Sequence, residues 1–213
     1  MTMMETSLNQ IKHSKIIAVI RTHSFEDALW SCETLIEAGI QAIEITMTTP
    51  NACELISICR KHYPNCLVGA GTVLSTDMAI TCINAGAQFM VSPATSPECI
   101  DFAKQKDILF IPGCATPTEI YQAMQLDAAA IKLFPIIPLG GVKLLKAIRG
   151  PFPDVLIIPT GGVTIEDAVE ILDAGAIAVG IGSPLIQRSW LENKDREALT
   201  LNTKKLLSHV SHF

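Results

Sequence analysis

Short apolar runs alternate with longer amphipathic segments along most of this chain. Eight runs rich in Ile, Val, Leu and Ala recur roughly every 20 to 28 residues. They are IIAVI (16–20), AIEIT (42–46), LVGAGT (67–72), FMVS (89–92), LFIPG (109–113), AAAIKLF (128–134), LIIPTG (156–161) and IAVGIGS (177–183). This alternation predicts buried parallel strands that are joined by crossover helices.

The amphipathic segments have the marks of helices. FEDALWSCETLIEAG (25–39), TDMAITCINAGA (76–87) and TIEDAVEILDAGA (164–176) carry apolar residues at helical spacing and a glycine near the end. The endings EAGI, NAGA and DAGA are a weak sign of a repeated unit. We also expect an extra helix before residue 14 and a last helix after residue 190.

Length and hydrophobic content limit the number of domains. With 213 residues, 49% of them hydrophobic, the chain can bury one large core. Eight strands with intervening helices fit the lower size limit of a (β/α)8 barrel. We therefore predict one α/β domain over residues 1–213, a single (β/α)8 TIM barrel with an extra N-terminal helix. An open doubly wound sheet is the alternative.

Charge and hydropathy indicate which kind of partner, nucleic acid, membrane or small molecule, the chain binds. The net charge is −5 and no Lys/Arg run is present, so we expect neither a nucleic-acid nor a membrane partner, but a small molecule. No apolar stretch reaches the roughly 20 residues of a bilayer span, and MTMMETSLNQ lacks the pattern of a secretory signal. We expect a cytoplasmic protein.

The seven cysteines are an odd number without a C-x-x-C pair, which predicts reduced thiols. Cys114 alone falls in a predicted strand-to-helix loop. It could act as a nucleophile, or it could simply fill space in a packed protein.

In a barrel, catalytic side chains come from the carboxyl ends of the strands. The residues at these ends are Arg21, Glu44, Thr46, Thr72, Ser92, Pro93, Lys132, Thr160, Gly161, Gly162, Gly182 and Ser183.

Lys132 lies between AAAI and LFP, in a strand otherwise built for burial. Desolvation disfavours the charged form of an amine, and the free amine can attack a carbonyl to form an imine. Glu44 is a carboxylate inside another apolar strand, and it could move protons beside such an imine. The alternatives are a lysine that reaches solvent from a strand end, and a structural ion pair between the two side chains.

The turns PTGGV (159–163) and GIGS (180–183) follow the last two predicted strands, where barrels commonly bind phosphate. Glycine turns also occur for tight packing alone. GAGT (69–72) could offer the Thr72 hydroxyl and backbone donors to a carboxylate.

Metal and dinucleotide chemistry are not expected. The five histidines show no H-x-H or H-x-x-x-H spacing, and His23, the one near the predicted rim, fits a surface loop. No G-x-G-x-x-G fingerprint is present. We therefore predict no cofactor and no metal site.

The motifs IEIT, GAGTV, VSP, PGCATPTE, KLFP, PTGGV and VGIGS occur in this order. In them the chain resembles the bacterial 2-keto-3-deoxy-6-phosphogluconate (KDPG) / 4-hydroxy-2-oxoglutarate (KHG) aldolase family, from IIAVIR at 16 to GIGSPL at 185. The resemblance implies a class I aldolase, usually a homotrimer. Such an enzyme cleaves KDPG to pyruvate and glyceraldehyde 3-phosphate, or KHG to pyruvate and glyoxylate.

The resemblance also implies roles for single residues. Lys132 matches the Schiff-base lysine and Glu44 the general acid/base of the family. The remaining implied roles are substrate and carboxylate binding at Arg21 and Thr72, pocket lining at Phe134, aldehyde-face selection at Thr160, and phosphate binding at Gly161, Gly162, Gly182 and Ser183. Thr46 and Pro93 complete the expected substrate-binding set.

One departure concerns EITMTT, where many members read E-V-T-L-R-T, so that Thr48 stands in the place of a substrate-binding arginine. The bidentate contact that an arginine would make to an anion is then missing. A shorter substrate such as KHG is therefore an alternative to KDPG. Two other functions also stay open from the residues alone. One is a sugar-phosphate isomerase or epimerase with Glu44 as base, and the other is a non-catalytic phosphate sensor.

Overall fold

The strands form two parallel sheets in a computed structural model that describes residues 1–213. The larger sheet has six strands in the order β5-β4-β3-β2-β1-β9, and the smaller has the order β6-β7-β8. The strands are β1 (Ile16–Ile20), β2 (Ala42–Thr46), β3 (Leu67–Gly71), β4 (Phe89–Val91), β5 (Leu109–Ile111), β6 (Gly113–Cys114), β7 (Ile131–Leu133), β8 (Ile157–Pro159) and β9 (Val179–Ile181).

The predicted closed eight-stranded barrel is wrong. The expected strand at 109–113 is divided at Pro112, which has no N–H to donate to a neighbouring strand. Its first part, β5, pairs with β4, and its second part, β6, pairs with β7, so the two sheets separate there. At the other junction a single bridge between Thr160 and Gly180 joins β8 to β9. The fold is an α/β fold with a half-barrel sheet of six strands and a small second sheet of three.

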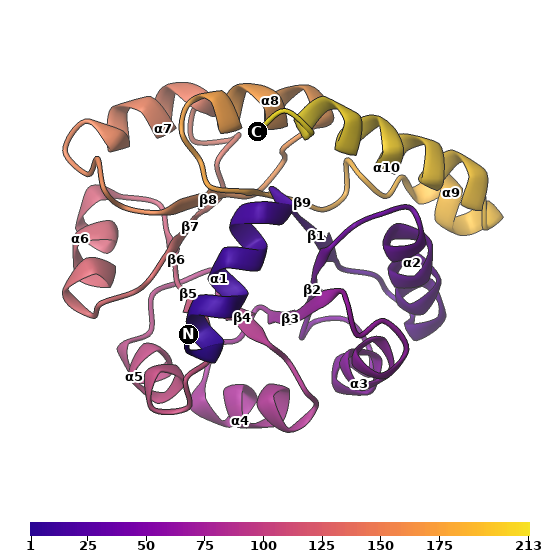
Figure 1. Cartoon of the computed structure of the whole chain (residues 1–213), viewed down its shortest axis with the longest axis horizontal. Helices are drawn as coiled ribbons and strands as arrows, with labels where there is room; N and C mark the ends of the chain where they lie inside the picture. Colours follow the sequence, from indigo (N-terminus) through magenta and orange to yellow (C-terminus); the bar gives the residue numbers. More distant parts are fainter.

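Ten helices surround the strands (Figure 1). They are α1 (Met3–Ser14), α2 (Phe25–Glu37), α3 (Ala52–His62), α4 (Thr76–Asn84), α5 (Pro97–Gln105), α6 (Pro117–Gln125), α7 (Val142–Arg149), α8 (Ile165–Asp173), α9 (Arg188–Asn193) and α10 (Arg196–Val210). The helix expected before residue 14 and those expected within 25–39, 76–87 and 164–176 are present. The segment after residue 190 contains the end of α9 and all of α10. None of the helices combines the length and hydropathy of a bilayer crossing.

Side chains of each strand alternate between two apolar clusters, because successive residues of a strand point to opposite faces. One cluster packs the strands against the outer helices and includes Ile16, Ile43 and Met90. The other faces the centre of the molecule. Its members are Ile11, Ile17, Ala42, Leu67, Phe89, Val91, Leu109, Ile111, Ala130, Ile158 and Ala178.

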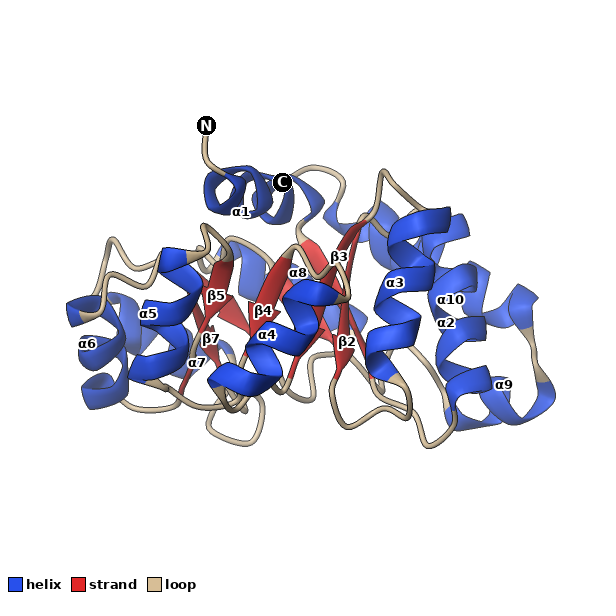
Figure 2. Cartoon of the chain, turned by 90° about the horizontal axis from the view of Figure 1, so that it is seen from below, coloured by secondary structure: helices blue, strands red, loops and turns tan.

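Helix α1 covers one end of this inner cluster. Ile11 of α1 is fully buried in it, and Met4 and Leu8 pack against it. Figures 1 and 2 show α1 lying across the amino ends of the strands, with the outer helices around them. The inner space is therefore closed at the α1 end, so a substrate has to enter from the opposite end.

Candidate active site

Along β2, β7 and β8 and the residues next to them, an apolar residue of the inner cluster is followed two positions later by a polar residue on the same face. The apolar residues are Ala42, Ala130 and Ile158, and the polar ones that follow them are Glu44, Lys132 and Thr160. All three polar side chains are buried. Because the strands are parallel, this second layer lies toward their carboxyl ends, away from α1.

Lys132 and Glu44 meet in this layer. The Lys132 amine donates to Glu44 Oε1 at 3.4 Å, and the two side chains are 7% and 3% exposed. The amine also lies 5.2 Å from the centre of the Phe134 ring. Removing a lysine and a glutamate from water costs free energy that their attraction only partly offsets. A contribution to folding stability therefore does not by itself explain why this buried pair is present.

Glycines make room for these side chains. A methyl group at Gly71 would overlap the Glu44 carboxylate, and one at Gly180 would overlap the Thr160 hydroxyl. Gly113, the register partner of Lys132, lies directly against the backbone of Pro93. Pro93, one of the predicted site residues, is half-buried. Its contact with Gly113 places it beside the strand that pairs with β7, which carries Lys132.

A cavity of about 360 Å³ opens over Lys132. Eight of the predicted site residues line it: Arg21, Lys132, Phe134, Thr160, Gly161, Gly162, Gly182 and Ser183. Glu44 lies beside its wall, in contact with Lys132, and Pro93 is not part of the lining. Sequence reasoning missed five lining residues: Val19, Thr22, Pro184, Ile186 and Leu191.

Two predicted threonines lie near this cavity without lining it. The Thr46 hydroxyl is fully buried, donates to the Ile20 carbonyl at 3.1 Å and contacts the Thr48 hydroxyl at 3.0 Å. The Thr72 hydroxyl accepts a hydrogen bond from the Arg21 guanidinium at 3.2 Å. Thr72 has φ 60°, a left-handed conformation that is unusual for a β-branched residue and is found mostly where function requires it.

The glycine turns form one side of the cavity. Gly161 and Gly162 have φ of 105° and 81°, conformations that a residue with a Cβ rarely adopts. The turn lies at the cavity edge together with the exposed Ser183. Glycine turns of this kind can offer backbone N–H groups to an anion.

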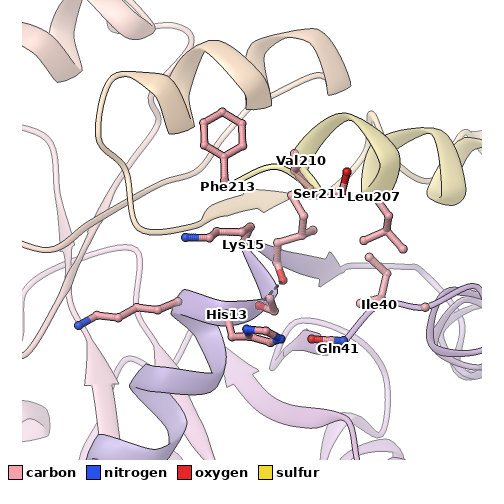
Figure 3. Close-up of a pocket in the computed structure, with 12 residues that line it drawn as sticks. His13, Lys15, Ile40, Gln41, Leu207, Val210, Ser211 and Phe213 are labelled. Atoms are coloured by element: carbon pink, nitrogen blue, oxygen red, sulfur yellow. Dashed lines mark hydrogen bonds between the residues drawn. The ribbon is translucent and has the colours of Figure 1, made fainter.

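Another cavity, of about 510 Å³, lies at the α1 end (Figure 3). It is lined by residues of the α1–β1 junction and the chain's last helix, including His13, Lys15, Gln41 and Leu207. No aspartate or glutamate side chain lines it. The paired acid and amine lie at the opposite end of the strands.

The possible metal ligands and the cysteines are arranged as follows. No group of three or more His, Cys, Asp or Glu residues is placed to hold a metal ion. All seven cysteines are free. Burial raises the pKa of the Cys114 thiol to about 11, so this thiol is protonated at neutral pH and is a poor nucleophile.

Comparison with known proteins decides the family. The family model for KDPG and KHG aldolase matches residues 8–201 of this chain. The chain belongs to the KDPG and KHG aldolase family. The KHG/KDPG aldolase of Escherichia coli K12 is 33% identical over 87% of both chains.

Solved structures of KDPG aldolases share the fold. The enzyme of Legionella pneumophila, with pyruvate captured at low pH as a covalent carbinolamine intermediate, superimposes with a TM-score of 0.86 and 31% identity, over 94% of this chain and 97% of that one. The enzyme of Zymomonas mobilis ZM4 with 3-phosphoglycerate has a TM-score of 0.86 and 29% identity, over 95% of both chains.

Proposed function

We propose that this protein is a class I aldolase, a carbon–carbon lyase that cleaves KDPG to pyruvate and glyceraldehyde 3-phosphate. KHG, cleaved to pyruvate and glyoxylate, is a second substrate of the same site. The observation that carries the proposal is the buried Lys132 amine, 3.4 Å from the Glu44 carboxylate at a cavity otherwise lined for an anionic ligand. The carbinolamine captured in the Legionella pneumophila relative is the same type of chemistry.

In the first stage Lys132 acts as the nucleophile. Its proton passes to Glu44, and the free amine adds to the C2 carbonyl of the substrate to form a carbinolamine. Glu44 then returns a proton to the C2 hydroxyl, which leaves as water. The product is an iminium ion that links C2 to Lys132, and its positive charge can accept an electron pair.

In the second stage the C3–C4 bond breaks. Glu44 takes the proton of the C4 hydroxyl, the C4 oxygen forms the carbonyl of the leaving aldehyde, and the bonding electrons move to the iminium nitrogen. The resulting enamine is protonated at C3. Water then adds to the iminium carbon, and breaking the bond between this carbon and the Lys132 nitrogen releases pyruvate. One carboxylate within reach of both the amine and the substrate serves all of these transfers.

The remaining residues orient the substrate. In this proposal Arg21, which donates a hydrogen bond to Thr72, binds the carboxylate of the pyruvate half, and Phe134, whose ring lies beside the Lys132 amine, shields the imine from water. Thr160 faces the aldehyde half. The turn of Gly161 and Gly162 and the Ser183 region offer peptide donors to the phosphate.

Trapping with borohydride tests the covalent step. We expect pyruvate and borohydride to add one stable mass to wild-type protein, on Lys132 in the peptide map. K132A should remain folded, take up no label and lose pyruvate release in a coupled assay. K146A, which removes an exposed lysine of α7, should behave as wild type. An unlabelled wild-type protein, or pyruvate release retained in K132A, would overturn the covalent mechanism. Wild-type protein that interconverts sugar phosphates without releasing pyruvate would favour an isomerase or epimerase that uses Glu44 alone.

The homotrimer that the family resemblance implies is also a proposal. It is supported by exposed apolar side chains such as Leu74, Ile80 and Tyr121, which a partner copy could cover. Native mass spectrometry should give three times the mass of one chain, and a monomer would exclude this assembly.

A further inference from the structure

The cavity over Lys132 has a second cavity beside it. This outer cavity has a volume of about 600 Å³. The two share the lining residues Arg21, Thr22, Ser183, Ile186 and Leu191, so they adjoin, and together they are called the joint space. The rest of the outer lining comes from His23, Asp27, Arg188 and Glu192. A substrate that is seated on Lys132 and is longer than the inner cavity would extend toward these charged groups.

Three cationic side chains line the joint space, and they are not equally available to a ligand. Lys132 is paired with Glu44, and Arg21, which donates a hydrogen bond to the Thr72 hydroxyl, is the residue proposed above to bind the carboxylate of the pyruvate half. Arg188 binds Glu192 at 2.7 Å on one exposed turn of α9, with side chains 91% and 59% exposed. Exposed pairs of this type are weak, because water and salt screen them. Arg188 can therefore exchange its partner at little cost.

The acidic residues of the outer cavity leave this exchange possible. Asp27 is bound to Lys194, whose amine also lies 5.3 Å from the centre of the Trp30 ring. The pKa of the Asp27 carboxyl is lowered by its hydrogen bond to Lys194, which indicates a charge that is satisfied elsewhere. Glu192 is then the one carboxylate that competes with an incoming anion for Arg188.

We propose that Arg188 determines specificity for a phosphorylated aldehyde half, by exchanging Glu192 for the phosphate of the substrate. This inference rests on the proposed function of the site and deepens it. Peptide donors at the glycine turns hold the phosphate oxygens, and the guanidinium supplies the charge that a phosphate dianion needs. Glu192 covers Arg188 when no phosphate is bound and disfavours substrates without one.

Steady-state kinetics of R188Q, E192Q and R196Q on KDPG and KHG test this role. Arg196 is a matched control, because it is an exposed cation that pairs with Glu33 and Glu37 of α2 outside both cavities. We expect R188Q to raise the KM for KDPG relative to that for KHG by about tenfold, the size of one charge-assisted hydrogen bond. E192Q should lower the same ratio severalfold, and R196Q should leave it at the wild-type value. Equal changes for both substrates in R188Q would overturn the proposal.

A binding measurement separates this inference from the proposed function. Calorimetry with glycerol 3-phosphate does not require turnover. We expect wild-type protein to bind this ligand, R188Q to bind it about tenfold more weakly, and added salt to reduce the difference. Failure of wild type to cleave either keto acid would reject the aldolase, whereas equal affinities in wild type and R188Q, or no binding to wild type, would reject the role of Arg188.

Discussion

The carboxylate of Glu44 occupies the space in which a side chain at Gly71 would begin. We therefore expect G71A to push this carboxylate away from Lys132. Proton transfer depends on donor and acceptor lying within hydrogen-bond distance, so kcat should fall by about two orders of magnitude. Pyruvate release in a coupled assay measures the effect.

Gly69 provides the matched control for this variant. It lies in the same strand, but the nearest atoms that a methyl group there would meet belong to the Phe89 ring of the apolar cluster. Both variants should lose about 1 to 3 kcal/mol of unfolding free energy from overpacking. Only G71A should lose kcat in the folded protein, and an equal loss in G69A would argue against Glu44 as the group displaced.

E44Q keeps the size of the side chain and removes its ability to accept a proton. We expect kcat to fall by about 10² to 10⁴, the usual contribution of a positioned acid or base. Borohydride should still trap pyruvate on Lys132, more slowly, because the amine remains in place. A variant within a few-fold of wild-type kcat would show that another group moves the protons.

The positions of the strands followed from the sequence, but the closure of the sheet into one barrel was predicted wrongly. The expected strands at 16–20 and 42–46 have the observed bounds of β1 and β2. Apolar runs report burial, whereas closure of a sheet depends on hydrogen bonds between strands that are distant in the chain. Pro112 inside LFIPG has no backbone N–H to donate, and it is the one local signal in the sequence against a continuous strand at 109–113.

The residues of the site also fall into those that the sequence could predict and those that it could not. A lysine and a glutamate inside apolar strands predicted that the two side chains share a buried space, and they lie 3.4 Å apart. Val19 could have been found from the two-residue period of β1, since it precedes Arg21 on the same face. Ile186 and Leu191 could not, because the packing of the segment after β9 against the site is set by tertiary contacts and not by a local pattern.

Cys114 allows a test of the alternative nucleophile. The pKa of this thiol is raised to about 11, mainly by burial, while the Thr95 hydroxyl acts to lower it and the nearby Glu119 to raise it. Iodoacetamide labelling at Cys114 should therefore be slow near neutral pH and should keep rising tenfold per pH unit beyond pH 9, where an ordinary thiol levels off. C114A should retain kcat. Rapid labelling at neutral pH with loss of activity would instead support a catalytic thiol.

Glu119 stabilises the helix that follows β6. Its carboxylate accepts hydrogen bonds from the N–H groups of Ala115 and Thr116, both at 2.8 Å, which closes a capping box at the start of α6. The hydrogen bond from the Ala115 N–H is the main cause that lowers the pKa of this carboxyl below its ordinary value of 4.5. At neutral pH, E119Q should lower the free energy of unfolding by about 1 kcal/mol.

The pH dependence of this difference gives the stronger test. A carboxyl whose pKa is lowered by folding contributes stability above its unfolded value, and this contribution is lost as the pH falls through the folded pKa. Urea unfolding should therefore show wild type and E119Q converging below about pH 4.5 and separated at pH 7. E98Q is the control, because the Glu98 carboxylate at the start of α5 accepts only from the Ser96 hydroxyl, at 3.1 Å. If the difference in unfolding free energy between wild type and E119Q stayed constant across this pH range, the substitution would act through altered packing and not through the loss of charge-assisted hydrogen bonds.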